Sequence, residues 1–178
     1  MRAFFVKIRG GGGVPPRAAL GEVFWSWLGG FVGIALVGWL DQGWLHDRDV
    51  MFLVGSFGAS AVLLYGAPAS PLAQPRNLIV GHLLSALVGV ACYRFLPLVD
   101  WVVAAAAVSG AIAAMHLTRS LHPPGGATAL IAVIGSEQVH ALGFRYALTP
   151  ILAGACLMLL VALLVNNLVP GRRYPLWW

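Results

Sequence analysis

Charge is scarce in this chain, since Lys, Arg, Asp and Glu together make up only 10% of its 178 residues while 60% are hydrophobic. Cysteine is also scarce. Cys92 and Cys156 both fall in apolar runs, where they are expected to be small buried hydrophobes; they predict no disulfide framework and leave the redox compartment undetermined. So little charge excludes an ordinary soluble domain. Uncharged runs of about 17 to 25 residues can cross a bilayer as helices, so the sequence predicts an all-α polytopic membrane protein.

Carboxylates are the scarcest chemical group. The chain has six Asp and Glu residues, and none lies inside a predicted span, which argues against a carboxylate-based cation or proton pathway. The sequence has no Ser-His-Asp pattern, no paired acids and no His-Glu-x-x-His spacing. We therefore expect no enzyme activity, no cofactor and no metal. A metal site built from His82, His116 and His122 is disfavoured because no carboxylate accompanies it.

The positive charges cluster at the chain ends. The net charge is +5, but a basic arm (residues 1–21) and a basic aromatic tail (170–178) hold most of the cations, as the positive-inside rule predicts for a membrane protein. Nucleic acid is therefore not an expected partner. Between these ends, residues 22–169 form a single predicted transmembrane domain. An acidic loop over 41–49 is expected on the non-cytoplasmic side.

We expect about six spans, at residues 22–40, 50–66, 77–96, 101–117, 123–135 and 150–169. The run 123–135 is shorter than a full crossing and could instead be re-entrant. Six crossings with both termini in the cytoplasm keep eight cations inside and three outside, whereas five crossings would move Arg172 and Arg173 outside. The charge distribution therefore favours six.

One polar motif interrupts the apolar sequence at residues 118–130. Pro123 and Pro124 cannot lie inside a helix but can open one. Gly125 and Gly126 follow, and they are expected to leave backbone N–H groups uncovered at the helix start, where an anion can bind. Ala127 and Thr128 complete the predicted binding segment.

A second copy of the small-residue pattern lies in the other half. Gly58-Ala59-Ser60-Ala61-Val62-Leu63 matches residues 126–131 at every small position. If 22–97 and 101–169 are two three-span units, the odd number of spans inverts one relative to the other. Transporters built this way bind substrate where interrupted helices meet. The alternative is that such motifs only pack membrane helices.

Four larger polar residues complete the candidate site. Ionisable groups at membrane depth are functional candidates by default. His122 is interpreted as functional because it adjoins the broken backbone, whereas Arg119 could equally be an end charge. His82 lies inside a span, and Arg76 or Arg119 would supply positive potential. All these groups, with the hydroxyls of Ser60 and Thr128, favour an anion.

The run Leu121-His122-Pro123-Pro124-Gly125-Gly126-Ala127-Thr128-Ala129 resembles the signature of the HPP family of integral membrane proteins. Residues 57–64 and 70–77 resemble two further blocks of that family, so the resemblance covers roughly residues 20–170. It implies a transporter-like role. Plastid members are regarded as nitrite transporters, which implies a small monovalent anion for this chain.

The sequence thus predicts a transporter or channel for a small monovalent anion, nitrite first among them. Three alternatives stay open: a pore for a small neutral solute, a membrane-embedded histidine metalloenzyme, and a non-transporting assembly protein. The expected location is a plasma membrane of the bacterial inner-membrane type, with many crossings and both termini cytoplasmic. The expected partners are the anion and the lipid bilayer, and homo-oligomerisation is left open.

Overall fold

The computed structural model describes residues 13–42 and 55–178. Within these residues every regular element is a helix, and four helices are long and apolar enough to cross a membrane: Leu20–Leu40, Pro75–Phe95, Asp100–Leu117 and Ala147–Leu168. The predicted all-α polytopic fold is confirmed. Residues 1–12 of the predicted arm and the predicted acidic loop from residue 43 on lie outside the described part, as do residues 50–54 of the second span.

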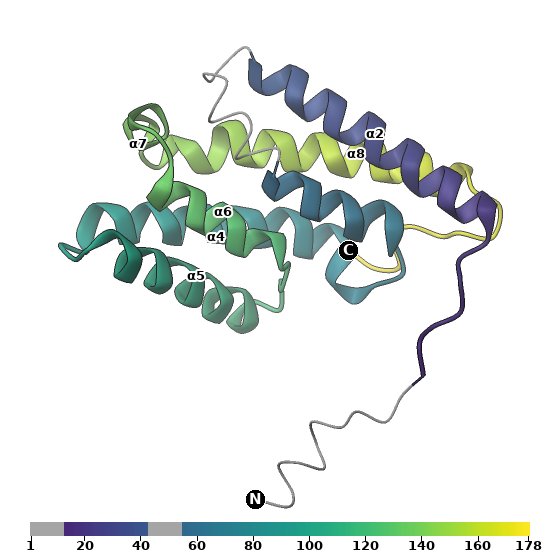
Figure 1. The fold of residues 1–178 in the computed structure, drawn as a ribbon, viewed down its shortest axis with the longest axis horizontal. Helices are drawn as coiled ribbons and strands as arrows, with labels where there is room; N and C mark the ends of the chain where they lie inside the picture. The colour runs from purple at the N-terminus through teal and green to yellow at the C-terminus, as the bar shows by residue number, and fades with distance from the viewer. Residues whose placement is uncertain (1–12, 43–54) are drawn as a thin grey trace, which may run out of the picture.

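The described helices follow the predicted spans closely, and from residue 55 onward they are joined by short connections (Figure 1). In chain order they are α2 (Leu20–Gln42), a helix over residues 55–61 that continues as the π-helical turn η1 (Val62–Gly66), the 3₁₀ turn η2 (Pro71–Ala73), α4 (Pro75–Phe95), α5 (Asp100–Leu117), α6 (Pro124–Ile134), α7 (Glu137–Leu142), the π-helical η3 (Ala147–Leu152) and α8 (Ala153–Leu168).

Proline defines where several helices begin. Pro75 and Pro124 occupy the first turns of α4 and α6, where their missing N–H donor is not needed. Thr149, which precedes Pro150, has an extended backbone (φ −135°, ψ 115°) that kinks the helical segment running into α8. A residue before proline is pushed out of the helical region by the ring. This rule explains the predicted helix start at Pro150, which has a helical turn before it. At Pro124 the preceding Pro123 keeps helical angles (φ −51°, ψ −38°), so that start follows from the missing N–H donors of the two prolines.

The segment that carries the second copy of the repeated motif is short. The 11 residues of α6 span about 16 Å at 1.5 Å per residue, roughly half of a hydrocarbon core. Residues 118–123, between α5 and α6, contain no helix. The chain nevertheless passes from one end of the bundle to the other between α5 and α7. The helix α7 lies at the end of the bundle opposite the last residues of α5, because its His140 stacks on Tyr93 at the end of α4, with ring centroids 3.7 Å apart. The fifth segment is therefore an interrupted crossing of the bundle.

The packing is consistent with two inverted halves. In the first half α2 packs on α8, and η1 packs on α2 and α8; in the second half α5 packs on α4, and α6 packs on α5 and α4. Exchanging the first three segments for the last three reproduces the same neighbours. Corresponding helices run in opposite directions, as α2 and α5 do in Figure 1. The predicted inverted repeat therefore agrees with this arrangement.

The chain enters and leaves the bundle at one end. Arg172, just after α8, donates from Nε to Glu22 Oε2 in the first turn of α2 at 2.8 Å. The same end holds the start of α4 and the end of α5, so it carries most of the described arginines: Arg17, Arg76, Arg119, Arg172 and Arg173. We call it the arginine-rich end. Arg94 and Arg145 lie at the opposite end.

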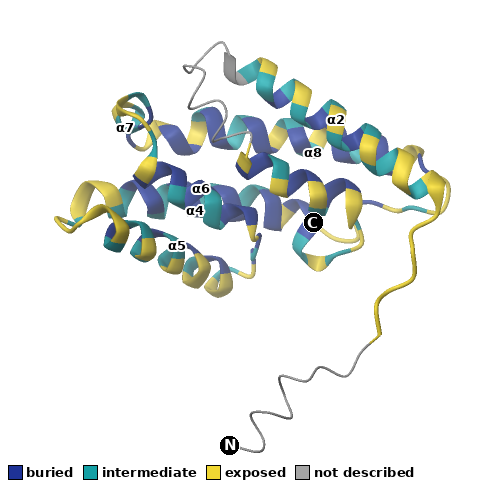
Figure 2. Ribbon diagram, in the orientation of Figure 1, coloured by how far each residue is buried: buried dark blue, intermediate teal, exposed yellow. Residues whose placement is uncertain are grey.

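Burial distinguishes the inner helices from the outer ones. Figure 2 shows more dark blue, buried positions on α4, α6 and α8 than on α2 and α5, which carry many exposed positions. The exposed side chains on α2 include Trp27, Phe31 and Trp39, which is expected for surfaces that face lipid. The inner helices meet where the polar residues of the predicted site gather.

Candidate functional site

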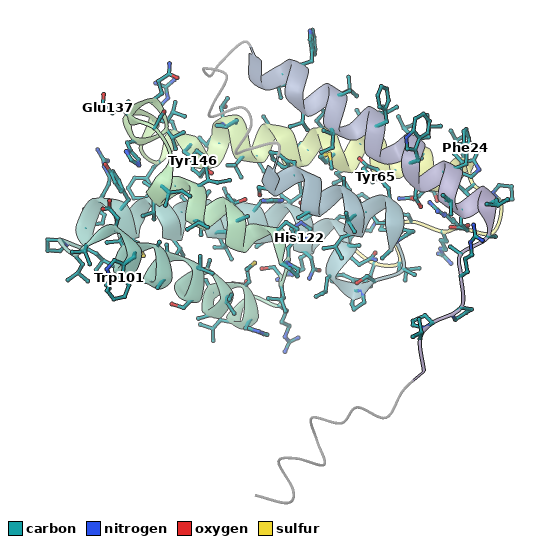
Figure 3. The ribbon with its side chains drawn as sticks, in the orientation of Figure 1. Phe24, Tyr65, Trp101, His122, Glu137 and Tyr146 are labelled. Atoms are coloured by element: carbon teal, nitrogen blue, oxygen red, sulfur yellow. The ribbon has the colours of Figure 1, made fainter. Side chains whose placement is uncertain are left out.

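A cluster of polar side chains lies at the centre of the bundle, where helix 55–61, α4, residues 118–123 and α6 meet. Its members are fully buried, with at most 1% of each residue exposed: Ser56, Ser60, His82, His122 and Thr128. Figure 3 shows His122 in the interior, whereas Trp101 and Glu137 lie at the end opposite the arginines. We call these five residues the central network.

Helical spacing and a chain break bring the network together. Ser56 and Ser60 are one turn apart on helix 55–61, so they share a face. His122 sits in the non-helical segment that the following two prolines impose. Its approach to α4 requires Gly81, because a Cβ on that glycine would lie 2.7 Å from His122 Cβ. The predicted small-residue face of α4 thus makes room for the predicted histidine.

The hydrogen bonds form one continuous chain. Ser56 Oγ lies 2.8 Å from Thr128 Oγ1, and Thr128 Oγ1 lies 2.8 Å from His82 Nδ1. Ser60 Oγ bridges the two histidines, at 2.8 Å from His82 Nε2 and 2.9 Å from His122 Nε2. His122 Nδ1 ends the chain on the backbone carbonyl of Leu72 at 2.9 Å.

The carbonyl of Leu72 sets the direction of every bond in this chain. A carbonyl only accepts, so His122 Nδ1 must carry a proton; in a neutral ring Nε2 then accepts from the Ser60 hydroxyl. Ser60 in turn accepts from His82 Nε2–H, and His82 Nδ1 accepts from Thr128. The protons are assigned from this pattern of partners. Both imidazoles are neutral in this arrangement, and each of their nitrogens has a partner.

The ring contacts fit this neutral state. The centroids of His82 and His122 lie 4.9 Å apart, and Phe57 packs on His82 at 5.1 Å. Two imidazolium ions at that separation, with an aromatic wall and no carboxylate among the hydrogen-bond partners, would repel each other in a low-dielectric setting. The network is therefore stable as a set of neutral dipoles.

The expectation of uncovered N–H groups at the start of α6 is wrong. Gly125 N donates to His122 O at 2.8 Å, and Gly126 N donates to Pro123 O at 3.0 Å. The turn that the two prolines impose places these carbonyls within reach of the glycine amides. Gly125 instead serves close packing, because a Cβ there would lie 2.5 Å from Ser85 Oγ on α4.

Four small residues of the predicted site lie away from the central network. Gly58, Gly126 and Ala127 are partly exposed and Ala59 is exposed. A Cβ on Gly58 would meet nothing within 4 Å, and one on Gly126 would meet only Val108 Cγ1, at 3.8 Å. The helices run unbroken through both glycines, and the interruption precedes Pro124. The binding role of these four residues stays a prediction.

The two predicted arginines are also outside the network. Arg76 and Arg119 are exposed and line a cavity of about 570 Å³ at the arginine-rich end. Leu72 lines the same cavity, and its carbonyl receives the last hydrogen bond of the network. The cations thus lie next to the end of the polar chain.

Two polar residues of this region were not singled out from the sequence. Ser56 lies four residues before Ser60 on the same helix, so the two serines share a face, and helical periodicity could have identified Ser56 from the sequence. Asn77 lines the cavity and bonds Leu121, 44 residues away, and no local signal predicts that pairing. His116 is exposed at the end of α5, and no three His, Cys, Asp or Glu side chains within 13–42 and 55–178 gather as metal ligands.

Comparison with known proteins agrees with the motif at the interrupted segment. The profile of the HPP transmembrane region matches residues 15–175. Two transmembrane proteins of Dictyostelium discoideum are 49% and 50% identical to this chain, over 98% and 92% of its length and 57% and 58% of theirs. The chain therefore spans less than two thirds of these relatives. No solved structure matches it. The match over nearly the whole chain shows that this protein belongs to the HPP transmembrane family.

Proposed function

We propose that this protein transports a small monovalent anion across a membrane, with nitrite as the first candidate. The observation that carries the proposal is the central network, which joins the helix over residues 55–61 to α6 at the middle of the bundle. Nitrite itself is suggested by the resemblance to plastid members of the family. The protein acts in this proposal without catalysing a reaction.

The burial of the network supports a functional role. Polar groups at membrane depth are costly and mark substrate paths more often than packing. Here five polar side chains are fully buried, and they come from both halves of the chain. Interrupted helices that meet at the middle of inverted halves are where secondary transporters bind their substrates.

The chemistry of the network favours an anion over a cation. Its side chains offer hydroxyl and imidazole N–H donors. The carboxylates with described side chains, Glu22, Asp100 and Glu137, lie at helix ends. Arg76 and Arg119 at the arginine-rich end raise the positive potential near the Leu72 end of the path, which attracts small anions.

The arrangement in this structure fits a closed state. Every donor of the hydrogen-bonded chain is occupied by an internal acceptor, so a passing ion must displace at least one of these bonds. Ser60 and Thr128 are the natural points of exchange, because a hydroxyl can turn from its present partner to an ion without moving the backbone. Several weak donors of this kind let an ion enter without trapping it.

We place the arginine-rich end, and with it both termini, in the cytoplasm of a plasma membrane. Five of the seven arginines in the described part lie at that end. The positive-inside rule supports this orientation. Accessibility of cysteines introduced at Gly13 and Gly171 in intact cells tests it, because both should be protected from an impermeant thiol reagent.

The transport proposal is tested by nitrite uptake into liposomes that contain the purified protein. Ser60→Ala removes the hydroxyl that bridges both histidines, and it should lower uptake by roughly tenfold or more. Ser109→Ala is the matched control, because Ser109 is exposed and donates only to carbonyls of its own helix, at 2.8 and 3.2 Å. Equal uptake by wild type and Ser60→Ala would show that the network is not on the path.

A pore for a small neutral solute is the second candidate. It is favoured by the neutral state of both imidazoles and by the position of Arg76 and Arg119 at the end of the bundle. A membrane potential distinguishes the two candidates, because it drives a charged ion and leaves a neutral solute unaffected. Nitrite uptake that rises with an inside-positive potential supports the anion transporter, and uptake of formamide with no such dependence supports the pore.

A further inference from the structure

The cavity at the arginine-rich end contains a buried acceptor that lacks a donor. The cavity measures about 570 Å³, and its lining includes Leu72, Arg76, Asn77, Arg119, Leu121 and Trp177. Asn77 is only 4% exposed. Its Oδ1 atom is buried and has no hydrogen-bond partner within the described residues.

The orientation of the Asn77 amide is fixed by its other end. Asn77 Nδ2 donates to the carbonyl of Leu121 at 2.7 Å. Turning the amide over would place Oδ1 against that carbonyl, so that two acceptors would face each other. Oδ1 therefore requires a donor from outside residues 13–42 and 55–178, because a buried unpaired acceptor is unfavourable by about 1 to 3 kcal/mol.

The two arginines add donors of the opposite character. Arg76 Nη2 donates to the Thr118 carbonyl at 3.0 Å, which leaves other N–H groups of its guanidinium for a ligand. Arg119 follows α5 with a positive φ of 54°, and its guanidinium has no partner among the residues that the structure describes. A pair of guanidinium groups is suited to the oxygens of a planar oxyanion.

We propose that this cavity binds a small monovalent oxyanion that carries an O–H group, such as bicarbonate or dihydrogen phosphate. The arginines donate to the unprotonated oxygens, and Asn77 Oδ1 accepts the O–H. Nitrite and nitrate have only acceptors, so they satisfy the arginines but leave Asn77 unpaired. The inference goes beyond the transport proposal and does not depend on nitrite being the transported ion.

Bicarbonate and nitrate make a matched pair of probes, because both are planar, monovalent ions with three oxygens around one central atom, and only bicarbonate carries a proton. Calorimetric titration of the full chain in a neutral detergent, at a pH where bicarbonate is the main form, should show bicarbonate binding roughly tenfold more tightly than nitrate. Equal affinities, or no binding of either ion, would overturn the proposal. The wild-type ratio needs no variant to fold.

Three variants assign the preference to its residues. Asn77→Leu should remove the preference for bicarbonate while nitrate still binds. Arg119→Gln should weaken both ions, and Arg94→Gln, at the opposite end, should change neither. A bicarbonate preference that survives Asn77→Leu in correctly folded protein would show that Asn77 Oδ1 is satisfied by water.

Two further measurements separate related explanations. Phosphatidic acid in the micelles carries the same phosphate chemistry as a free ion, so the free-ion proposal fails if phosphatidic acid changes Trp177 fluorescence and bicarbonate does not, with Trp177→Phe identifying the signal. Nitrite uptake by Asn77→Leu in liposomes keeps the proposals distinguishable. Uptake at the wild-type rate combined with a lost bicarbonate preference supports this site, and loss of both would make Asn77 part of the transport path.

Discussion

The centre of the bundle and its arginine-rich end hold polar groups in opposite ways. At the centre, uncharged side chains bond one another, and each imidazole nitrogen has a partner at 2.8 or 2.9 Å. At the end, Arg119 and Asn77 line a cavity, and the buried Oδ1 of Asn77 has no hydrogen-bond partner among the described residues. The buried groups of the centre thus satisfy one another, whereas the arginine-rich end keeps a buried group without a partner beside a cavity.

Removal of an imidazole from the centre should have the largest effect on stability. His122→Ala leaves the Ser60 hydroxyl and the Leu72 carbonyl without their partner and opens a cavity, so we expect a loss of about 3 to 4 kcal/mol. Unfolding by SDS titration in mixed micelles measures it. His116→Ala, at an exposed position, should change stability by no more than about 0.5 kcal/mol. Similar losses for both histidines would contradict the contrast between buried and exposed sites.

At the arginine-rich end, the side chain of Arg172 is buried and hydrogen-bonded within the protein, as the side chains of the central network are. The Arg172 side chain is 7% exposed and donates to Glu22 Oε2 at 2.8 Å and to Asn166 Oδ1 at 2.9 Å. Arg172→Gln should therefore cost about 2 to 3 kcal/mol in the same titration. Arg173→Gln, one residue later and exposed, is the control and should be near neutral. An Arg172→Gln protein as stable as the wild type would show that this contact does not hold the two chain ends together.

Replacement by alanine at Gly81 and at Gly126 should change the stability of the protein in opposite directions. A Cβ at Gly81 would lie 2.8 Å from the Ser120 carbonyl and 2.7 Å from His122 Cβ, whereas one at Gly126 would have 3.8 Å to its nearest neighbour. Gly81→Ala should destabilise by about 1 to 3 kcal/mol through overpacking. Gly126→Ala should stabilise by up to about 1 kcal/mol, because alanine favours the helix. A stable, active Gly81→Ala protein would mean that His122 can move.

The smallest effect is expected at Arg119, where stability and anion binding should change in opposite directions. Its φ of 54° lies in the left-handed region, which is unfavourable for a side-chain-bearing residue by about 1 to 2 kcal/mol. Arg119→Gly should thus raise stability by up to about 1 kcal/mol while it lowers bicarbonate affinity. Arg119→Gln keeps the strain and is the control. Loss of stability in Arg119→Gly would show that the guanidinium has a structural partner.

Local chemistry explains which features could be predicted from the sequence. Proline fixes its own φ and lacks the N–H donor that a helix interior needs but a first turn does not, so the start of α6 at Pro124 was predictable. Four apolar spans were correct within about three residues at each end because their lengths match a bilayer. His82 and His122 were identified because polar groups are rare in such spans, and the structure brings them together through Ser60.

Features that depend on distant contacts or on one backbone angle were not predictable. The glycine amides at the start of α6 bond to carbonyls that the prolines bring near, and a sequence pattern does not show that turn. Arg119 has a left-handed backbone just after α5, with a φ of 54°, and no sequence pattern predicts that angle for an arginine; its place near an anion path stays a prediction. Asn77 depends on the Leu121 carbonyl across a gap of 44 residues.

The central hydrogen bonds run in one direction, from Ser56 to the Leu72 carbonyl, and this order makes the two possible open states of a transporter unequal in energy. The scaffold has matching halves, but the network does not: with Gly58 aligned to Gly126, the position that corresponds to His122 is Val54. If the two halves exchanged conformations, the same bonds could not form again on the other side. The forms open to the two faces of the membrane are therefore not energetic mirror images, and the protein should rest with a built-in bias toward one of them.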